Sequence, residues 1–167
     1  MDRFKFEIFK KENPKTPMFE VVPLTLDKIQ IIQKKLFQLL NIEDNNIQEL
    51  EKRIYQIANV LIPSIPENNF SIKELFYNLN VESNFLYVTW DSFKTIDRFK
   101  LTDFCQWFEY IWYPSSDDID IFNDDLTWIL QVYHYETIAL AQLEKFGKEI
   151  PHLRIGLVNH IEVKQDK

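Results

Sequence analysis

The chain is poor in glycine and cysteine, and each shortage excludes a class of functional site. Its 167 residues include only two glycines, Gly147 and Gly156. Glycine-rich phosphate loops, dinucleotide-binding fingerprints and glycine-flanked serine elbows are therefore absent. A single cysteine, Cys105, excludes disulfides within the chain and cysteine-rich zinc sites.

Long hydrophobic runs are also missing. No segment has the roughly 18 uninterrupted apolar residues that a membrane-spanning helix needs. Acidic residues occur in the opening sequence MDRFKFE, where a secretory signal has none. We therefore expect a cytoplasmic protein without a membrane partner, and the lone cysteine fits a reducing compartment.

Lysine and arginine are absent between Leu101 and Glu144, although this segment contains nine acidic residues. The net charge of the chain is −7, so the segment carries −9 and the remainder carries +2. Three of the four tryptophans lie in the same segment. A concentrated negative surface repels the phosphates of nucleic acid and favours a basic protein partner.

The apolar content of 46% is that of one folded domain, and no repeat or flexible linker divides residues 1–167. Alternation of Phe4, Phe6 and Ile8 with charged residues predicts a strand, and the apolar run 18–22 would complete an N-terminal β-hairpin. The fold class we expect is α+β, with this hairpin and several short helices packed on a mainly antiparallel sheet.

Helical spacing of apolar residues predicts four helices. The first covers 25–41, the second runs from an N-cap at Asn46 to Pro63, the third follows an N-cap at Ser71, and the fourth runs from Thr102 to Pro114. Asn46 and Ser71 each precede a glutamate by three residues, as in a capping box.

Alternating patterns predict three further stretches of strand. Residues 85–90 are apolar on both faces and predict a central strand. The segment 118–121 predicts an edge-like strand whose aspartates form a solvated face. The apolar positions of 126–140 predict one long strand, or two strands joined near Tyr135.

The aspartates of 117–125 first suggest a calcium site, because Ca²⁺ prefers closely spaced carboxylate and amide oxygens. Their spacing does not fit an EF-hand loop. Counting from Asp118, positions 5, 6 and 12 hold Phe122, Asn123 and Ile129, where the loop needs an oxygen ligand, a glycine and a glutamate. We interpret these residues as an acidic hairpin and expect neither metal nor cofactor.

An enzyme remains an alternative. His134 and Glu136 are two residues apart, so on a strand both project from one face as a candidate general base and its orienting partner. Together with the acids between Asp117 and Asp125 they could surround a metal in a small hydrolase. Cys105 is interpreted as a small buried hydrophobe rather than a nucleophile.

The string 112–122, WYPSSDDIDIF, with Trp128 and His134 after it, resembles small cytosolic bacterial proteins of the toxin-immunity kind. The resemblance implies an antitoxin, not an enzyme, that occludes the active site of a basic toxin, such as a nuclease-type toxin. A structural or assembly subunit would share the acidic surface and differ only in its partner. The expected partner-binding residues are Asp117, Asp118, Asp120, Asp124, Asp125, Tyr133 and Tyr135.

Overall fold

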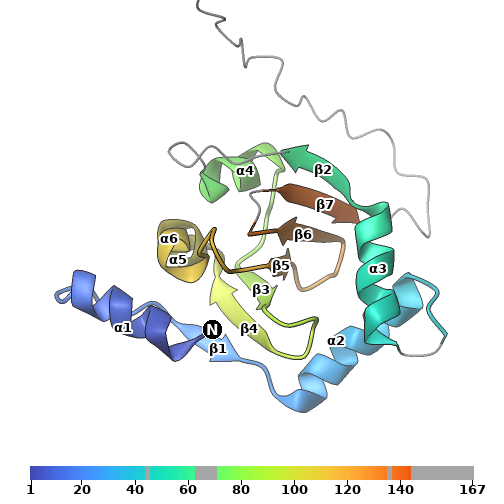
Figure 1. Cartoon of the computed structure of the whole chain (residues 1–167), viewed down its shortest axis with the longest axis horizontal. Coiled ribbons are helices and arrows are strands. Elements are labelled where there is room, and N and C mark those ends of the chain that lie inside the picture. The colour runs from blue at the N-terminus through green and yellow to red at the C-terminus, as the bar shows by residue number, and fades with distance from the viewer. Residues whose placement is uncertain (44–45, 63–70, 135–136, 144–167) are drawn as a thin grey trace, which may run out of the picture.

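The computed structural model describes residues 1–43, 46–62, 71–134 and 137–143, and its centre is one antiparallel sheet with helices on both faces (Figure 1). The seven strands found in these residues have the order β1-β4-β3-β5-β6-β7-β2, and every pairing is antiparallel. The strands are β1 (Val21–Pro23), β2 (Asn59–Ile62), β3 (Phe85–Thr89), β4 (Ile96–Lys100), β5 (Ile119–Phe122), β6 (Trp128–Val132) and β7 (Ile138–Gln142).

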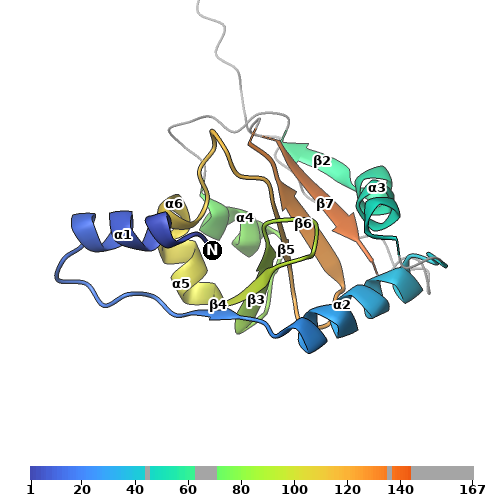
Figure 2. The ribbon, with the colours of Figure 1, turned by 60° about the horizontal axis from the view of Figure 1, so that its bottom comes forward.

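The helices lie in two layers, one on each face of the sheet (Figure 2). One layer consists of α1 (Arg3–Glu12), α4 (Ile72–Asn78), α5 (Leu101–Gln106) and α6 (Phe108–Ile111). The other consists of α2 (Leu26–Leu39) and α3 (Ile47–Ile57). The predicted α+β class and antiparallel sheet are therefore confirmed.

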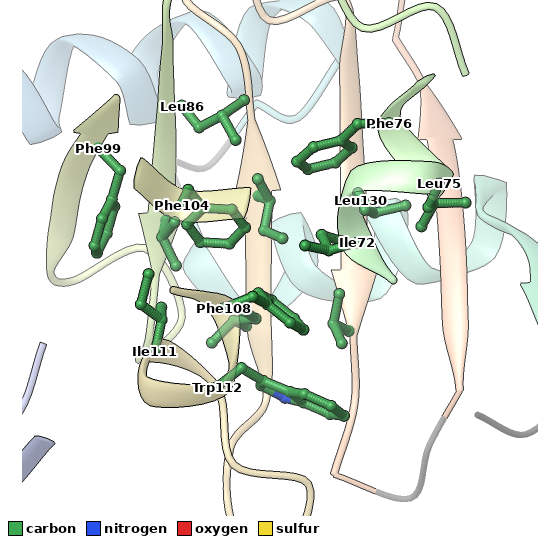
Figure 3. Close-up of a cluster of buried hydrophobic side chains, with 14 of the residues drawn as sticks. Ile72, Leu75, Phe76, Leu86, Phe99, Phe104, Phe108, Ile111, Trp112 and Leu130 are labelled. Atoms are coloured by element: carbon green, nitrogen blue, oxygen red, sulfur yellow. The ribbon is translucent and has the colours of Figure 1, made fainter. Parts of the chain in front are cut away.

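Each face of the sheet has its own hydrophobic core. Figure 3 shows the core under α4, α5 and α6, where Phe104 and Phe108 point toward the strands. On the opposite face, Leu36 of α2 and Ile54 of α3 pack with Phe122 of β5. β5 supplies both cores because Ile119 and Ile121 face one layer and Phe122 faces the other.

The N-terminal hairpin prediction is wrong, because residues 3–12 form the helix α1 and β1 pairs with β4. The buried residues of α1 are Lys5 and Phe9, which are four apart and so share one helical face. Phe4 and Ile8 are exposed. The alternation that predicted a strand therefore reflected surface residues, and a buried lysine concealed the helical period.

Helix positions are otherwise well predicted at their starts and less well at their ends. Asn46 and Ser71 cap α3 and α4, because their side-chain oxygens accept hydrogen bonds from the backbone N–H groups of Gln48 and Glu74. α3 ends at Ile57 rather than continuing to Pro63, since residues 59–62 pair with β7 as a strand.

The expected helix 102–114 is divided into α5 and α6 at Trp107, whose φ and ψ are −116° and 22°. Lys100, not Thr102, occupies the N-cap position. The break turns Phe108 into the core, where it is 9% exposed, and leaves Trp107 partly buried beside it.

The strand predictions hold for β3, which lies between β4 and β5, and for 126–140, which contains the two strands β6 and β7. The edge-like position predicted for 118–121 is wrong, because β5 lies inside the sheet between β3 and β6. A strand in that position has no free edge, so its aspartates must be accommodated on a face of the sheet.

Two tight turns of the sheet contain residues with positive φ although none of them is glycine. Ser92 and Phe93, between β3 and β4, have φ values of 51° and 61°, and Leu126, between β5 and β6, has 55°. A β-carbon makes this conformation costly, so surrounding contacts must hold it. Phe93 and Leu126 are both buried in the core under α2 and α3.

Candidate functional site

The α2/α3 face of the sheet carries an apolar row beside a polar row. Paired residues place Tyr87, Phe122, Ile129 and Ala141 in the apolar row. Two residues along each strand, and therefore on the same face, Thr89, Asp120 and Gln131 form the polar row. The apolar row packs against α2 and α3, whereas the polar row lies along an open groove.

We call this hollow the acidic groove, and its volume is about 470 Å³. One wall is α3, the other is the turn after β3, and the floor is formed by β5 and β6. Four acids line it, together with one lysine and several aromatic side chains. The acids are Glu51, Asp91, Asp118 and Asp120; the lysine is Lys52; the aromatic residues are Tyr55, Trp90 and Tyr133.

Asp120 is the most perturbed acid of the groove. Gln131 Nε2 donates a hydrogen bond of 3.0 Å to Asp120 Oδ1. The pKa of Asp120 is raised to about 7, mainly by burial; the hydrogen bond from Gln131 lowers it, and the nearby charges of Glu51 and Asp118 raise it. A carboxyl group poised in this way changes charge near neutral pH.

Gln131 is 5% exposed, and its Oε1 atom has no hydrogen-bond partner among the residues that the structure describes. A buried amide oxygen without a donor is unfavourable, and such groups in native proteins call for an explanation. Sequence reasoning missed this residue. The available signal was its position as the one strongly polar side chain of the β6 sequence WILQV.

Asp118 stands at the mouth of the groove with a half-exposed side chain. Its Oδ1 accepts a hydrogen bond of 2.7 Å from the His134 backbone N–H and lies 2.8 Å from His134 Nδ1. The structure therefore joins His134 to Asp118, while Glu136 and Tyr135 lie outside the described residues. Tyr133 lines the groove as expected of a surface residue next to these aspartates.

Asp117 belongs to a different environment. Its carboxylate forms an ion pair with Lys5, which is 1% exposed, and accepts a hydrogen bond of 2.8 Å from the Tyr113 backbone N–H. The Asp117 backbone oxygen also accepts from Trp112 Nε1 at 2.8 Å. These contacts attach α1 to the loop before β5, so Asp117 has a structural explanation that needs no partner.

Asp124 and Asp125 follow β5 and lie at its other end. Asp124 accepts a hydrogen bond from the Tyr87 hydroxyl and lines a second hollow, of about 240 Å³, with Lys28, Lys35 and Arg98. Asp125 is exposed. The five aspartates therefore do not form one strip, and only Asp118 and Asp120 share the acidic groove.

Burial raises the pKa of Tyr87 to about 12, and the hydrogen bond and charge of Asp124 act in the same direction, whereas Arg98 lowers it. The hydroxyl thus stays protonated and keeps its role as a donor to Asp124. Three basic residues and one aspartate line this hollow, so its net charge is opposite in sign to that of the acidic groove.

Other candidate chemistry is not assembled in the described part of the chain. No group of three or more His, Cys, Asp or Glu side chains there is placed to hold a metal ion. Cys105 is partly buried, and burial raises the pKa of its thiol to about 11 although Lys73 lowers it. A thiol with a raised pKa is a poor nucleophile. His152 and His160 lie outside the described residues.

No family model, no curated protein and no solved structure matches this chain. Within the described residues, none of the helices has the length and apolar character needed to cross a membrane. The acidic groove is therefore the structural feature that bears most directly on function.

Replacing Asp120 by asparagine is expected to make the protein more stable at pH 8, and this gain should shrink steadily as pH falls toward about 4. The folded-state pKa of Asp120 is raised from 3.8 to about 7, so the wild-type carboxyl contributes fully to stability below about pH 4 and loses that contribution as pH rises from about 4 to about 7. Asparagine resembles the neutral carboxyl at every pH.

The measurement is the midpoint of thermal unfolding of both forms between pH 5 and pH 8. Glu82→Gln is the control, because Glu82 is exposed and lies outside the groove. Parallel pH profiles for wild type and Asp120→Asn would contradict the burial of an ionisable Asp120 carboxyl.

Proposed function

We propose that this chain is a protein-binding module whose acidic groove receives a basic partner. The observation that carries the proposal is the state of Asp120, which is buried enough to raise its pKa to about 7 and forms no ion pair within the described residues. A buried carboxyl group without an ion pair lowers the stability of the folded protein. Local costs of this kind are typical of functional sites.

A basic partner would supply positive charge to pair with the acids of the groove. Cationic side chains entering it would meet Glu51, Asp91, Asp118 and Asp120, while Lys52, the one lysine in the lining, lies 3.6 Å from Glu49 in a surface ion pair. Complementary charge accelerates association and discriminates against acidic partners. The groove thus selects partners by charge before any close contact forms.

The particular form that we propose is an immunity protein of the bacterial cytoplasm that neutralises a basic toxin. A nuclease-type toxin needs a basic active site, since it must bind phosphates. An acidic protein seated there would occlude the site without any chemistry of its own. This form rests on the resemblance of 112–122 to toxin-immunity proteins, and that segment leads into the groove through Asp118 and Asp120.

The alternative of a metal-dependent hydrolase is less well supported. His134 is paired with Asp118, Asp117 is paired with Lys5, and Asp124 lies at the opposite end of β5. Ligands of one metal ion must converge within a few ångströms, and these side chains contact different partners instead.

The proposal is tested by affinity capture from the cells that express the protein, followed by measurement of association rates with the captured protein. We expect a basic partner whose association with the double variant Asp118→Asn/Asp120→Asn is strongly slowed at low salt and less affected at high salt. The association rate should depend more on these two aspartates than on the net charge of the protein.

A charge-matched control is the double variant Glu82→Gln/Glu109→Gln, since both glutamates are exposed and outside the groove. It should associate almost as fast as wild type. The proposal fails if no protein is captured specifically, or if both double variants show the same rates and the same dependence on salt.

A further inference from the structure

We infer that the acidic groove is built to receive a guanidinium group, so that an arginine side chain of the partner occupies its floor beside Asp120 and Gln131. This inference rests on the proposed function, which it deepens by naming the chemical group that is recognised. The argument comes from the hydrogen-bonding capacity of the groove, from its aromatic walls and from its size.

The floor of the groove offers acceptors in excess. Within the described part of the chain, Gln131 Oε1 has no donor, and the hydrogen bond that reaches the Asp120 side chain comes from Gln131 Nε2. Asp118 adds a half-exposed carboxylate two residues before Asp120, immediately ahead of β5. A group that fills this site must bring several N–H donors and no acceptor, which describes guanidinium and ammonium groups.

Geometry favours the guanidinium. Carboxylates two residues apart on a strand are separated by about 6.6 Å along the strand, which is too far for one small cation to contact both closely. A planar guanidinium with five N–H donors can bridge separated acceptors, and it also stacks on aromatic rings. Tyr55 and Tyr133 provide such rings in the lining.

The groove also has room for an entire side chain. Its volume of about 470 Å³ lies within the range of about 300–1,000 Å³ found for small-molecule sites. A metal ion fits poorly, since within the described residues no three acidic, histidine or cysteine side chains converge. The donor-rich and extended shape of an arginine side chain matches the site better.

Binding of a cation beside Asp120 should be linked to the loss of a proton. The groups that face Asp120 are Glu51, Lys52 and Tyr55 from α3, Asp91 from the turn after β3, and Asp118 and Tyr133 from the neighbouring positions. Glu51 and Asp118 raise the pKa of Asp120, and burial raises it most. The positive charge of a bound guanidinium would stabilise the ionised form of Asp120, so affinity should rise between pH 6 and pH 8.

The test uses N-acetyl-arginine methylamide as the probe and the isolated full chain as the protein. Binding is followed by NMR through the side-chain amide signals of Gln131 and the backbone amide signal of Tyr133. We expect saturable binding that weakens about tenfold or more in Asp120→Asn, because a charge-assisted hydrogen bond is lost. The dependence on pH should disappear in the same variant.

Two further probes identify the group. N-acetyl-citrulline methylamide has the same shape without the charge, and N-acetyl-lysine methylamide has the charge without the planar fork. Both should bind more weakly than the arginine probe. The variant Gln131→Met keeps the length of the side chain but removes the acceptor, so it should also weaken arginine binding, whereas Glu82→Gln should not.

The inference is overturned if the arginine probe does not saturate, if it shifts signals away from the groove, or if citrulline or lysine binds equally well. These outcomes are distinct from failure of the proposed function. A captured basic partner that depends on Asp118 and Asp120, combined with no arginine binding, would retain the protein-binding role and reject the guanidinium site.

Discussion

Replacing Lys5 by methionine is expected to lower the free energy of unfolding by about 3–5 kcal/mol, because it leaves a carboxylate in a buried site without its charged partner. Lys5 Nζ pairs with Asp117 and donates a hydrogen bond of 2.7 Å to the Ile111 backbone oxygen. It also lies 4.4 Å from the centre of the Trp90 ring. Methionine keeps most of the volume and removes only these interactions.

The measurement is denaturant unfolding, with Arg3→Met as the matched control. Arg3 is on the same helix, but its ion pair with Glu7 is exposed, so its loss should change stability by no more than about 0.5 kcal/mol. The double variant Lys5→Met/Asp117→Asn should recover part of the lost stability, since no unpaired charge remains. Equal effects of Lys5→Met and Arg3→Met would show that Lys5 is not buried with Asp117.

Replacing Phe9 by alanine is expected to cost about 3–5 kcal/mol, the usual range for removing a large aromatic side chain from a core. Phe9 is fully buried and meets the rings of Phe19, Trp107 and Tyr110 edge to face, with centroid distances of 5.1, 5.0 and 5.2 Å. These contacts join α1 to α5, α6 and the segment before β1.

Phe4→Ala is the control that distinguishes a helix from a strand at the N-terminus. Phe4 is 45% exposed on α1, so its removal should cost far less than that of Phe9. A strand with Phe4, Phe6 and Ile8 directed inward would reverse this order. Unfolding free energies of the two variants therefore decide which local structure residues 3–12 adopt.

The parts of the fold that could be predicted from sequence are those where local signals and burial agree. Asn46 and Ser71 stand at helix starts that their side chains cap, and 85–89 is apolar on both faces because both layers of helices cover it. The N-terminal helix could not be predicted in the same way. Its buried face depends on a lysine whose charge is compensated by Asp117, more than a hundred residues away in the chain.

The candidate site was only partly predictable for a related reason. The density of acids identified Asp118 and Asp120, but sequence proximity grouped them with three others. Asp117 and Asp124 contact other parts of the fold, and Asp125 is exposed. Gln131 becomes significant only when β6 is paired with β5. Pairing across a sheet is a property of the tertiary structure, and no local pattern contains it.

The scarcity of glycine bears on the order in which the molecule folds. Hairpins with glycine in their turns can close early, since the turn itself favours the required backbone conformation. Here Phe93 and Leu126 adopt positive φ in the turns of two neighbouring hairpins, and both are buried only when α2 and α3 have docked. We therefore expect the hairpins to be poor independent folding nuclei, and the central strands to consolidate together with the helices that cover them.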